Sequence, residues 1–540
     1  MIRKAVIATS MFAALGLPQL AVASKAWNIT KTSWSETDER NYSSFVQTLG
    51  ESGCRTVNAC LKSPANPYRG TDSPNASFWA DCGRYPYLLR AYFAWKNGLP
   101  FSIVSGVAAV EGLGDALQYS PKGNYVTARK DVVQRDANVA VDGYSTVNSL
   151  TKSVFSAMFR YNAELDKPDG KFYDLYPVSI DRKEIRPGTV IYDANGHIAV
   201  VYRVETDGRV RFFDSHPDQS VTRSVYGEKF ARSNPFSGAG FKNFRPITLT
   251  GATRTANGNY IGGRVTTVPM TQIPGFSLEY FYGTAANPSK AWRQAKFVLA
   301  GQTLPYYDFV RSRLAVGELK YQPVTEMLNY MDTLCNDIKE RVQAVDGAIN
   351  AGINLKAQPF ALPNNIYGTS GEWEEFSTPS RDARLKTSFV ELNTEVQKFV
   401  SLYRAGSSRV IYSGTDLIGD LRSAYEKAAE SCEVGYRRTD GSVATLTFHH
   451  VAARIWDLSF DPYHCVERRW GATDTDELST CKDGSQKDAW YQAERRLRNQ
   501  IERTYDAKMG FTLEQLQSKA AGSGVDAPPD ADLRRYLYSN

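Results

Sequence analysis

Apolar residues recur along this chain with two different spacings, and the change between them divides the sequence into two halves. Up to about residue 285, short helical patterns alternate with runs of alternating or continuous apolar residues. From residue 286 onward, apolar residues recur every three or four positions over long stretches. The first pattern is typical of helices packed on strands, and the second of amphipathic helices. We therefore predict an α+β fold, with a mixed N-terminal domain followed by a mainly α-helical C-terminal domain.

Three helices are expected in the N-terminal half. The first covers residues 35–50, where Ser35 is a candidate N-cap and acidic residues fill the first turn. The second begins just after Cys82 and ends at Asn97-Gly98, a common signal for a helix C-terminus. The third is predicted over Thr146–Tyr161, where Val147, Leu150, Val154 and Met158 share one face.

Strands are expected after residue 187. Gly188–Asp193 and His197–Glu205 are rich in β-branched residues, and Asp207-Gly208 is a strong hairpin signal. Arg209–Asp214 then returns antiparallel to the strand that His197 opens. We expect this hairpin to form part of an antiparallel sheet.

The domain boundaries follow from these patterns. Residues 24–250 form the first domain, and residues 251–285, rich in Gly, Thr and Asn, form a linker or extra strands. Residues 286–519 form the helical domain, in which 415–432, 444–459 and 485–508 are among the expected helices. Residues 520–540 contain small and polar residues with prolines, and we expect a flexible tail there.

The N-terminus has the pattern of an export signal. Residues 1–23 combine Arg3 and Lys4 with a short apolar run and end in Ala21-Val22-Ala23, which predicts cleavage after Ala23. No later segment is long and apolar enough for a membrane span. The formal net charge of +6 is spread among acids, which gives no nucleic-acid footprint. We expect a periplasmic or secreted protein.

Seven cysteines leave one thiol unpaired in an oxidising compartment. Of the many possible pairings, we favour Cys54 with Cys60, Cys335 with Cys432, and Cys465 with Cys481, which leaves Cys82 free. Cys82 precedes a predicted helix, where the positive end of the helix dipole stabilises a thiolate. The alternative is an inert, buried cysteine.

A nucleophilic thiol needs a base and a group that orients the base. The chain has five histidines, and His197 stands at the mouth of a predicted strand, exposed toward a cleft. Asp214 ends the paired strand and is the favoured third residue. Counted from a two-residue turn at Asp207-Gly208, Asp214 lies opposite Val201, so a bulge or twist must bring it to His197. His216 lies closer in the same register and stays the alternative.

Four segments resemble motifs of the NlpC/P60 cysteine peptidases, a papain-like family that acts on bacterial cell-wall peptides. They are Asn66–Gly70, Asp81–Gly83, Arg186–Tyr192 and Gly196–Tyr202, within residues 60–220. Phe212–Ser215 stands where the family has its third polar residue. The chain differs from the family in having Gly83-Arg84 for Ser-Gly and in an insertion across residues 100–180.

The resemblance implies a papain-like fold, with a helix packed on an antiparallel sheet, and a role for each matched residue. Cys82 would be the nucleophile, His197 the base and Asp214 the orienting residue. Tyr68 would supply a hydroxyl to the oxyanion site beside the Cys82 backbone N–H. Asp81 would meet the free amine of a peptide stem. No cofactor is implied, and the substrate would be a cell-wall peptide or protein.

Other chemistries have weaker sequence support. His449, His450, His464 and Cys465 suggest a zinc site, but they lack a metalloprotease His-Glu-x-x-His pattern, and Cys465 has an expected disulfide partner. We expect a cysteine peptidase or amidase that cleaves peptidoglycan peptides. The alternatives are a non-catalytic envelope protein whose helical domain binds a protein partner, and an acyl transferase that uses the same three residues.

Overall fold

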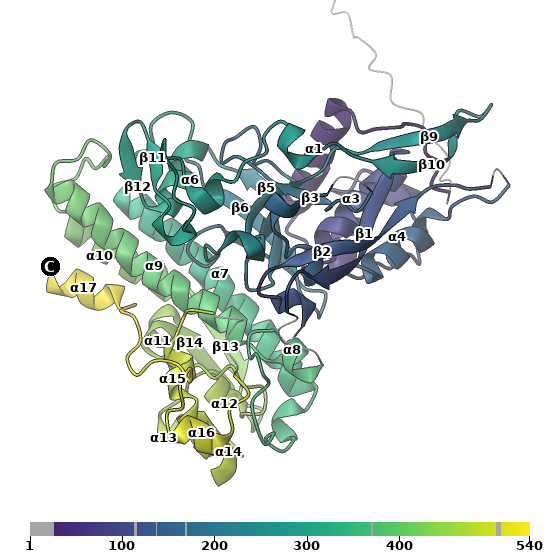
Figure 1. Ribbon diagram of the computed structural model, residues 1–540. Helices are drawn as coiled ribbons and strands as arrows, with labels where there is room; N and C mark the ends of the chain where they lie inside the picture. The colour runs from purple at the N-terminus through teal and green to yellow at the C-terminus, as the bar shows by residue number, and fades with distance from the viewer. Residues whose placement is uncertain (1–25, 113–115, 137, 168–169, 369–370, 504–508) are drawn as a thin grey trace, which may run out of the picture.

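The computed structural model describes residues 26–112, 116–136, 138–167, 170–368, 371–503 and 509–540. Antiparallel sheets occupy the N-terminal half and helices dominate the C-terminal half (Figure 1). One large hydrophobic core runs from Trp27 to Leu314, and a second from Met327 to Leu537. The expected α+β organisation is therefore confirmed. Residues 1–23, the expected export signal, lie outside the described residues.

A six-stranded antiparallel sheet is the centre of the N-terminal half. Its spatial order is β3 (Leu175–Pro177), β8 (Gly240–Phe244), β4 (Val190–Tyr192), β5 (Ile198–Val204), β6 (Val210–Ser215) and β7 (Val221–Val225). Helix α1 (Glu36–Glu51) packs so closely on β5 that a Cβ at Gly50 would lie 2.2 Å from Cβ of Tyr202. Only glycine allows this approach of helix to sheet.

Helices α1 and α3 (Tyr85–Lys96) have the expected ends. Ser35 caps α1 through a reciprocal pair of hydrogen bonds with Asp38. Helix α3 ends at Asn97, and Gly98 follows with a φ of 63°. Every residue of α3 except Lys96 is buried. The segment that Cys82 precedes is therefore enclosed by the fold and held in place.

The inserted region between α3 and the sheet forms a hairpin and one short helix. Strands β1 (Phe101–Ala109) and β2 (Asn124–Val132) pair antiparallel, and α4 (Gly143–Lys152) follows. The helix predicted over Thr146–Tyr161 is wrong at its end, because a turn at Ser153 is followed by a separate 3₁₀ helix at Ser156–Met158. The apolar residues Val154 and Met158 are buried from these turns instead.

Residues 251–285 belong to the first half as extra strands and a short helix. Strand β9 (Thr248–Arg254) pairs with β10 (Tyr260–Thr266), and α5 (Glu279–Tyr282) follows. The boundary expected at residue 286 is too early, since α6 (Tyr306–Leu314) packs its apolar face into the first core. The smaller elements of this half are α2 (Val57–Lys62), β11 (Phe297–Leu299) and β12 (Gln302–Leu304).

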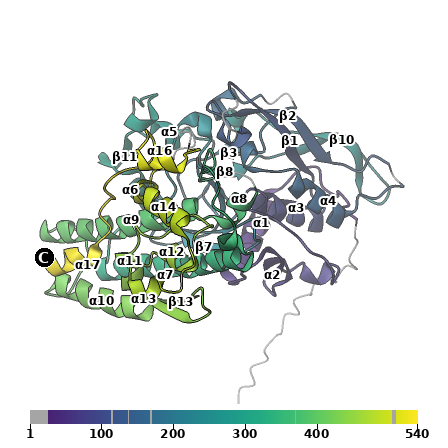
Figure 2. The same cartoon turned by 90° about the horizontal axis from the view of Figure 1, so that it is seen from below.

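The C-terminal half is built on three helices that lie side by side in both views (Figures 1 and 2). They are α7 (Pro323–Asn350), α9 (Pro379–Arg404) and α10 (Leu417–Ser431). The shorter helices are α8 (Glu372–Phe376), α11 (Phe448–Ala453), α12 (Val466–Arg469), α13 (Thr475–Leu478), α14 (Ser485–Ala493), α15 (Arg495–Asn499) and α16 (Leu513–Gln517).

Two predictions for this half are corrected. The helix expected over 444–459 begins as a strand, because β13 (Glu433–Arg437) pairs with β14 (Val443–Thr447), where β-branched residues alternate. Residues 520–540 are not a flexible tail: they end in α17 (Leu533–Ser539), whose Leu533 and Leu537 are buried against α9 and α10. Those two leucines dock the end of the chain.

Three disulfides join the pairs of cysteines expected from the sequence: Cys54–Cys60, Cys335–Cys432 and Cys465–Cys481. They fit an oxidising compartment. Among the helices of the described ranges, none has the length and apolar character needed to cross a membrane.

Candidate active site

Cys82 is the one cysteine outside a disulfide, and all seven cysteines lie in described residues. It sits in a turn three residues before Tyr85, the first residue of α3. The residue is half-buried rather than enclosed. The free thiol is thus partly accessible, in a turn that a rigid, buried helix holds in place.

Asp81, rather than Cys82, occupies the anion position at the start of α3. Its carboxylate accepts a hydrogen bond of 3.0 Å from the Arg84 backbone N–H and forms an ion pair with the Arg84 guanidinium. The N–H groups at this helix end therefore stabilise the Asp81 carboxylate. The expected stabilisation of a Cys82 thiolate by the helix dipole is corrected accordingly.

His197 and Asp214 form a direct pair. Nε2 of His197 lies 2.5 Å from Oδ2 of Asp214. His197 immediately precedes β5, as expected, but only 9 % of its surface is exposed, since Phe230 packs beside the ring. Because an ionised carboxylate only accepts hydrogen bonds, Asp214 places the imidazole proton on Nε2 and leaves Nδ1 as the basic nitrogen.

A β-bulge sets the register that brings these two residues together. Val201 pairs with Phe212, and Arg203 pairs with Arg211, so β5 carries one extra residue between the two pairs. Asp214 thereby lies opposite Ala199 instead of Val201, two residues nearer to His197. The bulge supplies one of these two residues. The other comes from the hairpin turn, which has three residues rather than the expected two, since the Glu205 N–H donates to the Arg209 carbonyl at 2.8 Å.

His216 lies beside this pair and bonds elsewhere. Its Nε2 is 3.0 Å from Oγ1 of Thr222 and 3.9 Å from Oδ2 of Asp214. Thr222 in turn donates to Oδ1 of Asp214. The Asp214 carboxylate is thus held by His197 on one oxygen and by Thr222 on the other, and the direct partner of His197 is Asp214.

Cys82 and His197 line one cleft of about 370 Å³. The backbone N–H of Ile198, the residue after His197, is close enough to Cys82 to favour its thiolate. The strand that positions the imidazole therefore also contacts the sulfur. The described cleft brings together three of the five residues expected from the sequence, Cys82, His197 and Asp81, and Asp214 lies directly behind His197.

Tyr68 is not brought to this site. Its hydroxyl is 3.0 Å from Nδ2 of Asn97, at the C-terminal end of α3, while Cys82 precedes the N-terminal end. A helix of this length separates its ends by roughly 18 Å. The oxyanion role expected for Tyr68 is therefore corrected: its ring packs on Phe45 and Phe93 instead.

Three polar side chains of the cleft gave no signal in the sequence. Gln118 comes from the inserted region, and Arg381 and Arg384 come from α9 in the helical half. They are far from Cys82 along the chain, and no motif connects them to it. Gln118 offers an amide N–H of the kind that stabilises an oxyanion.

The thiol and the imidazole are both held in their neutral forms. Burial and the Asp81 carboxylate raise the pKa of the Cys82 thiol to about 12. Burial and the nearby Arg384 guanidinium lower the pKa of His197. The Asp214 carboxyl has its pKa lowered despite its burial, because His216 and His197 favour the charged form.

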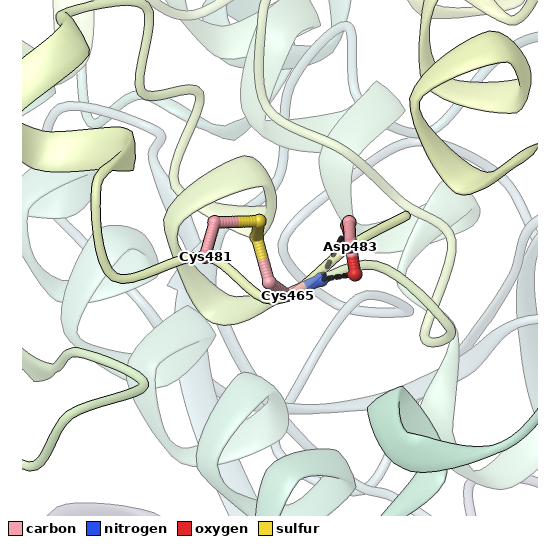
Figure 3. Close-up of side chains that lie close together, drawn as sticks. All are labelled: Cys465, Cys481 and Asp483. Carbon is pink, nitrogen blue, oxygen red and sulfur yellow. Dashed lines mark hydrogen bonds between the residues drawn. A yellow bond between two sulfur atoms is a disulfide. The ribbon is translucent and has the colours of Figure 1, made fainter. Parts of the chain in front are cut away.

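Two side-chain groups in the helical half have the composition of metal ligands. Figure 3 shows the first, in which the sulfurs of Cys465 and Cys481 are consumed in a disulfide and the Asp483 carboxylate accepts from the Cys465 backbone N–H at 2.9 Å. A disulfide sulfur is not a thiolate ligand.

The second group is Asp461, His464 and Glu494, all fully buried. Burial, and to a lesser extent the Arg498 and Arg469 guanidinium groups, lower the pKa of His464 to about 4. Burial and the neighbouring Asp461 carboxylate raise the pKa of Glu494 well above its usual value, so Glu494 is held as a neutral acid rather than as a metal-binding carboxylate. His449 and His450 lie elsewhere: Nε2 of His449 contacts Glu426 at 2.7 Å.

Comparison of the chain with protein-family models, with curated proteins and with solved structures gives no match.

Proposed function

We propose that this protein is a periplasmic or secreted cysteine hydrolase, a peptidase or amidase of the papain-like NlpC/P60 type that cleaves amide bonds in peptidoglycan peptides. The observation that carries the proposal is the cleft itself, where the one free thiol lies beside a buried His197–Asp214 pair. A sulfur nucleophile, a base and a carboxylate that orients the base are the three groups such a reaction needs.

The neutral thiol and imidazole fix how the proposed reaction begins. Sγ of Cys82 attacks the amide carbonyl carbon while its proton passes to Nδ1 of His197, and Asp214 stabilises the imidazolium that forms. The C–N bond then breaks, and the proton on Nδ1 goes to the leaving amine. Water hydrolyses the thioester, which releases the acid and restores the thiol.

The negative charge on the carbonyl oxygen needs donors. The Cys82 backbone N–H and the Gln118 side-chain amide are the candidate donors at the cleft. A single donor of this kind contributes about 3 kcal/mol to the transition state. Asp81 is ion-paired with Arg84, and in this proposal it receives the free amine of the peptide stem.

The test is digestion of purified cell wall by the wild-type protein and by Cys82→Ala, with the released peptides identified by mass spectrometry. We expect release by the wild type and none by Cys82→Ala. His449→Ala is the matched control, because His449 contacts Glu426 outside the cleft. Equal release by Cys82→Ala and wild type would refute the proposed nucleophile.

A non-catalytic envelope protein, with a papain-like scaffold and a partner bound by the helical half, is the second candidate. The raised pKa of Cys82 favours it, since a thiol held neutral is a poor nucleophile. On this alternative, wild type and Cys82→Ala release nothing from cell wall, and both bind the same partner.

A further inference from the structure

The helical half forms one wall of the cleft that holds Cys82. Gln343 and Gly347 of α7, Trp373 and Glu374 of α8, and the start of α9 face Cys82 and His197 across it. Contacts between α7 and β7 join the two halves next to this site. Any substrate that reaches the thiol therefore touches residues of both halves.

Arg381 and Arg384 place two guanidinium groups on that wall. Nη1 of Arg384 donates to Oγ of Ser380 at 3.0 Å, and Nη1 of Arg381 donates to the backbone carbonyl of Glu340 at 3.4 Å. Both of these acceptors are neutral. Within the described ranges, neither guanidinium has a carboxylate within salt-bridge distance.

Carboxylates lie near these arginines without forming salt bridges to them: Asp214 and Asp193 act on Arg384, and Arg381 acts on Asp218 and Glu340. Arg503, also close to Arg384, is already paired with Asp193 at 3.0 Å. A half-buried guanidinium without a carboxylate partner keeps several N–H donors available to an incoming anion. Arg381 and Arg384 therefore each keep N–H donors for a carboxylate that enters the cleft.

Acidic side chains also line this cleft. Asp81 and Glu374 both line it. Desolvation and the neighbouring Asp81 carboxylate raise the pKa of Glu374 to about 7, which reflects the crowding of two acids. The cleft thus presents acidic as well as basic side chains around Cys82 and His197.

We propose that Arg381 and Arg384 form a carboxylate-binding subsite, so that the helical half selects peptides that carry a free carboxylate near the bond that is cut. The proposal rests on the proposed hydrolase function for the identity of the peptide. The planar fork of arginine binds a carboxylate through two parallel hydrogen bonds, which positions the substrate as well as attracting it.

The first test uses two alkylating reagents that differ in charge. Iodoacetate is an anion and iodoacetamide is neutral, and both transfer their carbon to the Cys82 thiolate with loss of iodide. Without reductant, Cys82 is the one thiol available. Because both reagents need the same thiolate, the ratio of their rates cancels any change in the pKa of Cys82.

In Arg384→Gln, we expect the iodoacetate-to-iodoacetamide ratio to fall about threefold to tenfold, as loss of a nearby charge dictates. Arg381→Gln is the second variant, and it carries the same test where Arg384→Gln does not fold. Arg384→Lys keeps the charge and keeps most of the ratio. Arg404→Gln, at the exposed end of the same helix, is the matched control and leaves the ratio unchanged.

The second test compares cleavage of a stem peptide with a free carboxylate and of its carboxamide analogue. We expect the carboxylate peptide to have the lower KM in the wild type, and Arg384→Gln to remove that preference. An unchanged alkylation ratio in both arginine variants overturns the subsite, even where cell wall is still cleaved. A lowered ratio without any cleavage supports the subsite and contradicts only the proposed hydrolase function.

Discussion

His197 and Asp214 meet because strand β5 carries one residue more than β6 between their paired positions. The extra residue lies between Val201 and Arg203, and the result is a contact of 2.5 Å between Nε2 and Oδ2. Bulges of this kind redirect side chains next to active sites. The distance between the base and its orienting carboxylate is therefore set by the backbone of the sheet.

Asp214→Asn tests this relationship. An amide cannot offset the imidazolium, and it also permits the wrong tautomer of His197. We expect kcat for peptide cleavage to fall by about two to four orders of magnitude. The measurement is steady-state kinetics with one stem peptide.

Thr222→Val is the matched comparison for Asp214→Asn, since Thr222 donates to the other oxygen of Asp214. It removes one hydrogen bond and keeps the charge, so we expect a loss of about tenfold or less. A larger effect for Thr222→Val than for Asp214→Asn would contradict the assigned roles.

Because the pKa of Cys82 is raised, the rate of its alkylation should increase with pH. Alkylation needs the thiolate, and burial moves its pKa up to about 12 from the usual value of about 8.5. Between pH 7 and pH 10 we expect the rate at which iodoacetamide alkylates Cys82 to rise about tenfold per pH unit. At each pH this rate should stay below the rate for a free thiol. Mass spectrometry of the labelled protein measures it. A plateau below pH 8 would show a standing thiolate–imidazolium pair instead.

The sequence predicts the local parts of this site better than its assembly. Ser35, Asn97 and Gly98 mark the helix ends correctly because capping depends on residues within one turn. Cys82 could be singled out because the other cysteines pair two by two. The contact of His197 with Asp214 depends on a bulge, and no residue type marks its position.

Long-range packing explains the other differences. Tyr68 matches a family motif in sequence, yet it packs at the C-terminal end of α3, where its hydroxyl accepts a hydrogen bond from the side-chain amide of Asn97. Arg381 and Arg384 reach the cleft from α9, far from Cys82 along the chain. The final helix α17 forms because Leu533 and Leu537 have a core to enter, which composition alone does not reveal.

The disulfide between Cys335 and Cys432 closes a loop with a sequence separation of 97 residues. Cross-linking so long a loop restricts the unfolded chain strongly, so Cys335→Ala/Cys432→Ala should lose about 4 to 5 kcal/mol of stability. Cys465→Ala/Cys481→Ala, with a separation of 16, should lose about 3 kcal/mol. Urea unfolding followed by circular dichroism compares the two. The reverse order would rule out loop entropy as the main cause.

The buried ion pair between Arg341 and Asp382 connects α7 to α9 directly beside the proposed subsite. Nε of Arg341 lies 2.8 Å from Oδ1 of Asp382, and the two side chains are 0 % and 1 % exposed. Asp382→Ala leaves a buried guanidinium without its partner, which costs about 3 to 5 kcal/mol. Asp382 lies between Arg381 and Arg384 in the chain. We therefore also expect the folded molecules of Asp382→Ala to prefer the carboxylate peptide over its carboxamide analogue less strongly than the wild type does.

Arg341→Met/Asp382→Leu separates the two effects. Apolar side chains of similar volume avoid the unpaired charge, so this double variant should recover most of the stability that Asp382→Ala loses. Urea unfolding gives the stability, and KM for the carboxylate and carboxamide peptides gives the selectivity. If the double variant is as unstable as Asp382→Ala, the loss comes from packing of α7 on α9 rather than from the buried charge.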